Sequence, residues 1–292
     1  MPKVQTQRRT MTNKIYLCAI NNILSGSCDQ DCSFCTQSVK YRADIDRYYF
    51  KPIEQIVVEA KAAKKVDALG YCLVTSGLGL DDKKTEFIAK SAKAIKKEIK
   101  DIHLIACNGL ASTEQLKYLK ESGIDSYNHN LESSQNYYEK ICSTHSWDER
   151  YQTCLNVKSA GLSLCSGGIF GMGETREDRE ELIRSIISLK PDAVPVNFYH
   201  PNIALPLKSS NITKDEAVNI IKEIRNSMSE ENIIMVAGGR ELIFGNDLKD
   251  MFEAGANSMV IGNYLTTTGE LPEFDKKILS ELGLEIATVC PN

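Results

Sequence analysis

The sequence predicts a single-domain (β/α)8 barrel, an α/β fold of the TIM type. Three observations lead to this fold class. Eight short apolar segments alternate with helical patterns, glycines follow several of these helices, and no Pro/Gly/Ser-rich linker divides the 292 residues. Eight strands with their helices over about 250 residues is the size of such a barrel. A doubly wound open sheet is the competing arrangement, because it shows the same alternation.

The predicted strands are short and rich in apolar or β-branched residues, as expected for strands that are covered on both faces. In chain order they are Lys14–Ile20, Gly70–Thr75, His103–Cys107, Ile124–Asn130, Leu162–Gly167, Ala193–Phe198, Ile233–Val236 and Ser258–Ile261. The predicted helices between them are Ile53–Ala68, Thr85–Ile99, Thr113–Ser122, Asp148–Ala160, Glu177–Leu189, Lys214–Met228 and Asn246–Ala254. The barrel is expected over 14–270, with an N-terminal extension over 1–13 and a C-terminal tail over 271–292 that pack outside it.

Turn residues agree with these boundaries. Gly123, Gly161 and Gly255 each follow a predicted helix and precede a strand, where a glycine commonly ends a helix. Ser112 and Thr213 are each followed by Gln or Glu three residues later, which is the pattern of a capping box at a helix start.

Composition excludes several classes of protein. A net charge of −4 and a pI near 5.7 argue against nucleic-acid binding through overall positive charge. No apolar run reaches the roughly 20 residues of a membrane span, so we expect a cytoplasmic protein without a membrane partner. Ten cysteines in a reducing compartment favour metal binding or catalysis over structural disulfides.

The strongest local signal is a C-x3-C-x2-C cluster formed by Cys28, Cys32 and Cys35, placed after the first strand and before the first helix. Three thiolates leave one iron of a four-iron cube without a protein ligand, and such an iron can bind a small chelating molecule. Zinc is the alternative, but a zinc site needs a fourth ligand, and the chain has no second C-x2-C pair at a distance.

This cluster, with the aromatic Phe34 before its third cysteine, resembles the signature of the radical S-adenosylmethionine superfamily. The resemblance implies that the three cysteines hold a [4Fe–4S] cluster. S-adenosylmethionine would chelate the open iron through its amino and carboxylate groups. One electron from the cluster would then release methionine and a 5′-deoxyadenosyl radical, which abstracts hydrogen from an unactivated C–H bond.

A more specific resemblance, from about residue 15 to 267, is to the biotin synthase family. Five sequence pieces in the same order carry it: Tyr127–Glu132, Cys165–Thr175, Val194–Asn197, Ala237–Glu241 and Gly255–Ser258. The resemblance implies a sulfurtransferase that inserts sulfur into dethiobiotin to give biotin. It also implies an electron donor such as flavodoxin or ferredoxin, and a homodimer.

The resemblance further implies an auxiliary iron–sulfur cluster of [2Fe–2S] type, deep in the barrel, as the sulfur donor. Its ligands in the family are cysteines on three strands and an arginine on a later strand. Cys72, Cys165 and Arg240 match that pattern, although a salt-bridged barrel residue is the other interpretation of the arginine. The third cysteine departs from the pattern, because the family position falls on Ile105, whereas this chain has Cys107.

Residues two apart on a strand share a face, so Cys107 can still face the barrel interior, displaced by roughly 6–7 Å along the strand. Cys18 on the first strand can face inward too. Two interpretations remain open. The cluster is shifted or altered and uses some of Cys18, Cys72, Cys107 and Cys165, or Cys107 is a buried apolar cysteine and another group takes its place.

Four further residues receive roles from the resemblance. Arg150 would bind the S-adenosylmethionine carboxylate, for which a guanidinium is well suited, and Glu132 would bind the ribose hydroxyls, where the family usually has Asp. Asn130 and Asn197 would bind the cyclic urea of dethiobiotin, since an amide supplies both donor and acceptor. The alternatives without a functional role are that Arg150 is a solvated charge on a helix and that Asn130 and Asn197 cap strand ends.

The remaining candidates are interpreted as structural. Cys142, Cys154 and Cys290 lie on helical patterns or in the tail, and His145 is in a loop with no role assigned. Two rival functions stay open: another barrel enzyme of the same superfamily, of amino-acid mutase or hydrogenase-maturation type, and a non-catalytic zinc-binding scaffold.

Overall fold

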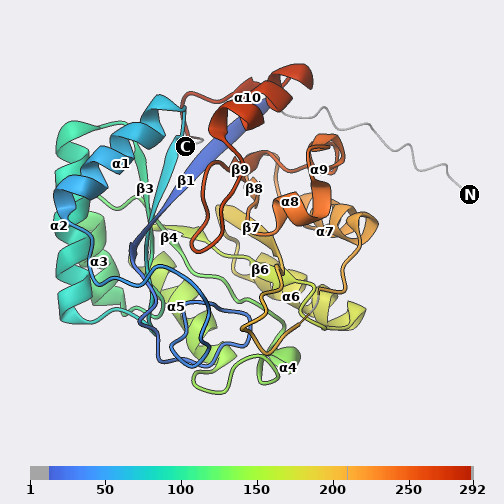
Figure 1. Ribbon diagram of the computed structural model, residues 1–292, viewed down its shortest axis with the longest axis horizontal. Helices are drawn as coiled ribbons and strands as arrows, with labels where there is room; N and C mark the ends of the chain where they lie inside the picture. The colour runs from blue at the N-terminus through green and yellow to red at the C-terminus, as the bar shows by residue number, and fades with distance from the viewer. Residues whose placement is uncertain (1–12, 209, 291–292) are drawn as a thin grey trace, which may run out of the picture.

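The computed structural model describes residues 13–208 and 210–290, and these form a closed parallel barrel (Figure 1). Its strands follow the order β1-β2-β3-β4-β5-β7-β8-β9, and β1 also pairs with β9. Every pairing in this circuit is parallel. The pairing of the first strand with the last confirms the barrel and excludes the open sheet.

The eight strands occur where the apolar segments predict them. Their bounds are β1 (Lys14–Leu24), β2 (Gly70–Thr75), β3 (His103–Cys107), β4 (Ser126–Asn128), β5 (Ser163–Cys165), β7 (Ala193–Phe198), β8 (Ile233–Val236) and β9 (Ser258–Val260). A short segment, β6 (Gly168–Phe170), continues the path of β5 after a break and also pairs with β7. The fifth barrel strand is therefore made of two pieces, which Ser166 and Gly167 separate.

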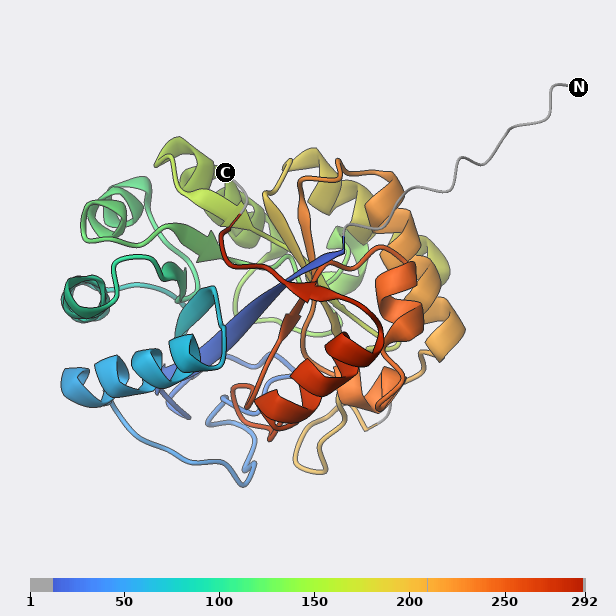
Figure 2. The same cartoon turned by 90° about the horizontal axis from the view of Figure 1, so that it is seen from above.

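The helices surround the strands as a ring, which Figure 2 shows from above. The predicted helices appear as α1 (Ile53–Lys65), α2 (Asp82–Glu98), α3 (Thr113–Glu121), α5 (Trp147–Ser159), α6 (Arg176–Ser188), α7 (Lys214–Asn226) and α9 (Lys249–Glu253). The capping boxes expected at Ser112 and Thr213 are both formed. Among the described residues, no helix combines the length and the apolar character that crossing a membrane requires.

Besides β6, three helices and one strand are additions to the predicted elements: α4 (Gln135–Tyr138), α8 (Arg240–Phe244), α10 (Pro272–Glu281) and β10 (Glu285–Ile286). β10 pairs in parallel with the start of β1, and Leu279 of α10 is fully buried. The described part of the tail therefore packs across the end of the barrel where the strands begin (Figure 2). Residues 1–12 of the predicted extension lie outside the described residues.

The interior of the barrel differs from the layer between strands and helices. The outer layer is a large apolar core built from side chains such as Leu73, Leu104 and Val236. The interior cluster is smaller and holds thiols among few large side chains: Cys18, Cys72, Val74, Ile105, Met235, Ala237 and Val260, with Cys107 packed against them. Alternate residues of one strand thus face opposite cores, as strand geometry requires.

Gly167 allows β5 and β7 to approach each other at the strand break. A Cβ atom at this position would lie 1.8 Å from the carbonyl oxygen of Pro195, which is far inside van der Waals contact. We expect Gly167→Ala to lower the free energy of unfolding by about 3 kcal/mol, at the upper end of overpacking costs. The shift in the thermal unfolding midpoint measures the effect.

Gly283→Ala is the matched control. Its Cβ would meet nothing within 4 Å, so only its positive φ of 69° opposes the substitution, and a left-handed non-glycine residue costs about 1–2 kcal/mol. Equal midpoint shifts for the two variants would contradict the close approach at Gly167.

Candidate active site

The predicted cluster cysteines lie in the irregular segment between β1 and α1. In Figure 1 this segment is at the end of the barrel opposite α10, where the strands end. Backbone hydrogen bonds fold it into tight turns: the amide of Cys35 donates to the carbonyl of Cys32 at 3.0 Å, and Val39 donates to the carbonyl of Cys28 at 2.7 Å. The side chains of site residues in a (β/α)8 barrel project at this end.

Burial and backbone N–H groups act on two thiols of this segment, those of Cys28 and Cys35. Burial raises the pKa of Cys28, while hydrogen bonds from the backbone of Gln30 and Gly77 oppose the shift. Burial also raises the pKa of Cys35 to about 12, against a backbone hydrogen bond from Gln37. Buried thiols with backbone donors aimed at sulfur suit iron–sulfur ligation, because such hydrogen bonds tune the cluster. The three cysteines therefore fit the cluster that the sequence implies.

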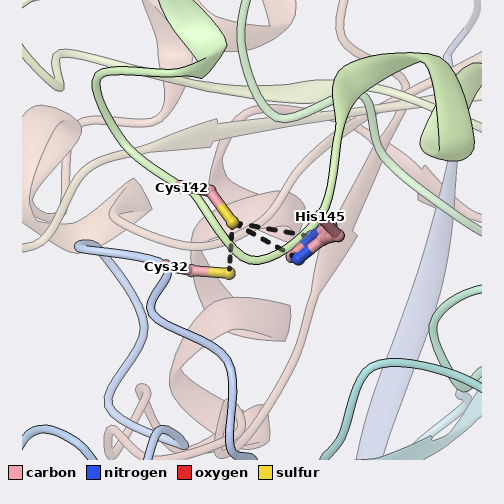
Figure 3. Close-up of side chains that lie close together, drawn as sticks. All are labelled: Cys32, Cys142 and His145. Atoms are coloured by element: carbon pink, nitrogen blue, oxygen red, sulfur yellow. Dashed lines mark hydrogen bonds between the residues drawn. The ribbon is translucent and has the colours of Figure 1, made fainter.

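A second set of three side chains, which shares only Cys32 with the predicted cluster cysteines, has potential metal-ligand atoms close to one another. Among the described residues, the only group of three or more His, Cys, Asp or Glu side chains with ligand atoms within 4.8 Å of one another is Cys32, Cys142 and His145 (Figure 3). The Cys32 thiol donates to Cys142 Sγ at 3.7 Å, and His145 Nδ1 is 3.3 Å from the same sulfur. This hydrogen bond, followed by the contact with His145, lowers the pKa of Cys142 to about 4, while burial opposes the shift.

Sequence reasoning missed Cys142 and His145 as site residues, because it interpreted the cysteine as structural and assigned the histidine no role. Their C-x2-H spacing was the available signal, since two ligands three residues apart can reach one metal. That signal did not indicate that the pair meets Cys32, which is 110 residues away.

Asp31 holds the segment of Cys142 against the cysteine segment. Its carboxylate accepts from the backbone amides of Ser143 at 2.9 Å and Thr144 at 3.2 Å, and from the Thr144 hydroxyl at 2.9 Å. Hydrogen bonds from Ser143 and Thr144 hold the pKa of Asp31 well below its usual range, against desolvation. The backbone amide of Ser33 also donates to the carbonyl of Ile141 at 2.8 Å.

Arg150 reaches the mouth of the barrel from the first turn of α5. Its Nε donates to the carbonyl of Asn130 at 2.7 Å, Nη1 to His145 Nε2 at 3.2 Å, and Nη2 to Glu132 Oε1 at 2.9 Å. Only 12% of the Arg150 side chain and 13% of the Glu132 side chain are exposed, so this is a buried ion pair. The interpretation of Arg150 as a solvated helix charge is wrong.

Glu132 combines an uncommon backbone with an unused oxygen. Its φ is 67°, in the left-handed region that side chains other than glycine seldom adopt, and its carbonyl accepts from the amide of Ile169 at 2.9 Å. Oε2 is buried and has no hydrogen-bond partner among the described residues. Desolvation raises the pKa of Glu132, while Arg150 opposes the shift. This oxygen is free to accept a hydrogen bond from an N–H or O–H group of a ligand.

Asn130 and Asn197 flank the break between β5 and β6. Asn130 Oδ1 accepts from the amide of Gly167 at 3.1 Å, and Asn197 Nδ2 donates to the carbonyl of Gly168 at 3.2 Å. Asn197 Oδ1 also accepts from Gly238 at 3.0 Å. Both side chains are half-buried and form hydrogen bonds with the backbone. Such bonds are what the alternative interpretation, a strand-end cap without a substrate role, predicts. An amide offers two N–H groups and two lone pairs, so further hydrogen bonds are possible.

The side chains of four cysteines, Cys18, Cys72, Cys107 and Cys165, lie in the barrel interior. A hydrogen bond with Cys107 is the largest cause of the strongly raised pKa of Cys72, followed by burial and the nearby thiols of Cys18 and Cys165. Burial raises the pKa of Cys165, with Cys18 and Cys107 among its neighbours. The register explains this arrangement, because Cys72 lies beside Ile105 and Cys107 lies beside Val74 on the same inward face. Cys107 therefore faces the interior, as strand alternation predicts.

The prediction that Arg240 lies on a barrel strand is wrong. It begins α8, directly after Gly239 with a φ of 76°, and its fully buried Nη2 donates to Asp275 at 3.0 Å and to Glu241 at 2.9 Å. The strand position that packs with the interior cysteines is Met235. The left-handed turn after β8 carries the chain out of the sheet before residue 240, and Arg240 then ion-pairs with the buried carboxylate on α10.

A cavity of about 190 Å³ enters the barrel from the end where the strands begin. Cys18 and Cys165 line it from the strands, and Cys290 lines it from the tail. It lies at the opposite end from Cys28 and Arg150, so it is not the mouth at which strand-end side chains meet. The cysteines of the segment after β1 therefore lie at the end of the barrel where the strands end, and the interior cysteines lie deeper, toward the end where the strands begin.

Comparison with known families matches two regions of the chain. Residues 22–186 match the radical SAM superfamily, and residues 195–285 match the biotin and thiamin synthesis associated domain. Curated relatives cover 95% of this chain. They include a biotin synthase from Sulfurovum sp. at 62% identity over 97% of its length and one from Nitratiruptor sp. at 59% over 99%. A biotin synthase from Campylobacter jejuni is 50% identical over 99% of its length.

Solved structures show the same fold at low identity. The hydrogenase maturase HydG from Carboxydothermus hydrogenoformans matches with a TM-score of 0.81 at 19% identity, covering 94% of this chain and 68% of its own. Methylornithine synthase (PylB) matches with a TM-score of 0.76 at 20% identity, covering 94% and 84% of the two chains. These likenesses support the barrel fold alone.

Proposed function

This chain belongs to the biotin synthase family of the radical SAM superfamily, and from that premise we propose which of its residues convert dethiobiotin into biotin. The observation that supports the proposal is the presence of two separate thiol sets in one barrel. Cys28, Cys32 and Cys35 lie in the segment after β1, and Cys18, Cys72, Cys107 and Cys165 lie in the interior. A reaction that needs both a radical and a sulfur atom needs two such sites.

The cysteines of the first set are proposed to hold the [4Fe–4S] cluster, which with S-adenosylmethionine supplies the 5′-deoxyadenosyl radical that removes hydrogen from dethiobiotin. Arg150 is proposed to bind the carboxylate of S-adenosylmethionine with the N–H groups that Glu132 and His145 leave unused. Oε2 of Glu132, buried without a partner, is proposed to accept from the ribose hydroxyls. In this proposal S-adenosylmethionine supplies hydrogen-bond partners that the protein does not provide to the Arg150 guanidinium and to Glu132 Oε2.

Asn130 and Asn197 are proposed to orient the cyclic urea of dethiobiotin at the strand ends. The backbone bonds to Gly167, Gly168 and Gly238 fix the plane of each amide, so that its remaining hydrogen-bonding groups keep a constant direction. The chain thus binds and orients the substrate, and the bound groups supply the homolytic chemistry.

The second set is proposed to hold the auxiliary cluster with thiols alone: Cys18, Cys72, Cys107 and Cys165. Four thiolates can bind either a [2Fe–2S] or a [4Fe–4S] cluster, and we keep the [2Fe–2S] type as the proposal. Arg240 has no part in the proposed set, because Asp275 and Glu241 bind its guanidinium. Iron and sulfide analysis of a Cys28/Cys32/Cys35→Ala variant counts this cluster by itself.

The surroundings of the reaction complete the proposal. Each radical event consumes one electron, so we propose an external one-electron donor of the flavodoxin or ferredoxin class. All ten cysteines are free, which suits work in the reducing cytoplasm. A homodimer is proposed from the family alone, and sedimentation of the purified chain tests it.

The test is an anaerobic assay with dethiobiotin, S-adenosylmethionine and a reductant, analysed by mass spectrometry. Formation of both biotin and 5′-deoxyadenosine supports the proposal. Formation of 5′-deoxyadenosine without biotin, from a chain that carries both clusters, contradicts it in favour of another enzyme of the superfamily.

Cys72→Ala separates the two thiol sets. We expect biotin formation to fall by at least about 100-fold, since even outer partners of a metal site contribute about 10–100-fold. Formation of 5′-deoxyadenosine continues, because Cys28, Cys32 and Cys35 are untouched. Cys154→Ala is the control, as Cys154 is buried in the outer core and donates to the carbonyl of His129. An equal loss of both products in Cys72→Ala would mean that the interior thiols are not a separate site.

A further inference from the structure

We propose that Cys32, Cys142 and His145 form a mononuclear site for one thiophilic divalent cation, Zn²⁺ being the best fit, in the chain that lacks its [4Fe–4S] cluster. The proposed function gives Cys32 to that cluster. The ion and the cluster therefore compete for one thiolate, and a chain loaded with zinc at this site cannot complete the cluster.

Two of the three distances between the ligand atoms match those of a single tetrahedral ion, and the third pair lies within 4.8 Å. Two sulfurs at ~2.3 Å from such an ion lie about 3.8 Å apart, and a sulfur and an imidazole nitrogen at ~2.0–2.1 Å lie about 3.5 Å apart. The Cys32 and Cys142 sulfurs are 3.7 Å apart, and His145 Nδ1 and Nε2 are 3.3 and 3.9 Å from Cys142 Sγ. Sulfurs that bind different irons of a cube lie farther apart, so this trio is not a fragment of the cluster geometry.

The chemistry of the ligands selects the ion. Two thiolates and one imidazole are the borderline-soft set that zinc takes, and three protein ligands leave the fourth position for water or a small anion. The site is also partly enclosed, since Cys142 is buried and Cys32 and His145 are half-buried. Calcium and magnesium are excluded because they require oxygen ligands.

The surrounding hydrogen bonds hold the ligands in place before any ion arrives. Asp31 fixes Ser143 and Thr144 through their backbone amides, and Gln30 Oε1 accepts from His145 Nδ1 at 3.1 Å. Ion binding at Nδ1 displaces that proton, and the neutral imidazole then carries its proton on Nε2. A proton on Nε2 cannot coexist with the hydrogen bond from Arg150, so the guanidinium turns away from His145 when the site is filled.

The experiment uses full-length Cys28→Ser/Cys35→Ser protein, which cannot hold the cluster but keeps all three proposed ligands. Anaerobic titration with Co²⁺, a spectroscopic substitute for zinc, is expected to show thiolate charge-transfer and tetrahedral d–d absorption from an ion at this site. Cys142→Ser or His145→Gln in the same background weakens that binding by more than about 10-fold. Cys154→Ser in that background is the matched control and leaves the binding unchanged.

Interior thiols can also bind Co²⁺, but they are intact in every one of these variants. Unchanged affinity after both Cys142→Ser and His145→Gln would overturn the proposal. X-ray absorption of the Cys28→Ser/Cys35→Ser protein with one equivalent of zinc provides a second readout that needs no further variant. Two sulfurs and at least one imidazole nitrogen support the site, and a shell of three or four sulfurs without imidazole contradicts it.

Competition with the cluster is tested on the otherwise unchanged chain. One equivalent of zinc, added before anaerobic reconstitution with iron and sulfide, is expected to lower the iron bound per chain. Cys142→Ser removes most of that effect. Zinc inhibition of equal size in both proteins would contradict the competition. None of these three experiments measures biotin, so a failed ion site is distinguishable from a failed proposed function.

Discussion

Cys35→Ala is expected to reduce formation of 5′-deoxyadenosine and of biotin below detection. Cys35 is one of only three cysteines in the segment between β1 and α1. A [4Fe–4S] cluster that keeps one open iron needs all three as ligands, and the variant supplies only two. Without that group the chain has no means to break an unactivated C–H bond, because its own side chains supply only binding and orientation. Liquid chromatography of anaerobic reactions measures both products, and iron analysis measures the lost cluster.

Cys154→Ala is the control for this experiment, since it removes a thiol that is buried in the outer core and belongs to neither thiol set. It is expected to retain both products and the full iron content. Iron should fall only by the share of the first cluster in Cys35→Ala, because the interior thiols remain. Normal 5′-deoxyadenosine formation by Cys35→Ala would show that the C-x3-C-x2-C segment does not carry the radical chemistry.

Arg150→Met is expected to destabilise the protein and to weaken its binding of S-adenosylmethionine. Removal of one partner of a buried pair leaves Glu132 as an uncompensated buried charge, which costs about 3–5 kcal/mol of folding free energy. Loss of a guanidinium from a ligand carboxylate costs at least about 2 kcal/mol, or about 30-fold in affinity. Thermal unfolding and equilibrium dialysis with labelled S-adenosylmethionine measure the two effects.

The double variant Arg150→Met/Glu132→Gln separates stability from binding. Neither side chain then carries a buried charge, so we expect much of the lost stability to return, whereas the affinity for S-adenosylmethionine stays low. Recovery of affinity together with stability would show that Arg150 acts on the fold alone and does not contact the ligand.

The strands of the barrel could be predicted because each one contains a short, nearly continuous apolar run, as burial on both faces requires. The two helices that follow the capping boxes at Ser112 and Thr213 were predicted at their first residue. The predicted helix Asn246–Ala254 begins three residues before α9, whose N-cap, Leu248, offers no side-chain hydrogen bond. Helix α8 was missed because it is only five residues long and follows a glycine with positive φ.

The sequence by itself determined the alternation of strands and helices, the three-cysteine segment, and the family to which they point. These are local patterns. They can be interpreted from the sequence because strands and helices have the same backbone geometry in every protein. The inward direction of Cys107 is of this kind, because two residues along a strand restore the same face.

Only the tertiary structure decided which distant side chains meet. Cys32 and Cys142 are 110 residues apart and touch because Asp31 binds the second segment, and Arg240 leaves the proposed cluster because Asp275 on α10 neutralises it. Such contacts depend on the closing of the barrel between β1 and β9 and on the buried charges that must then be paired. No periodicity in the chain encodes them, since they arise from packing between segments and not from the conformation of any one of them.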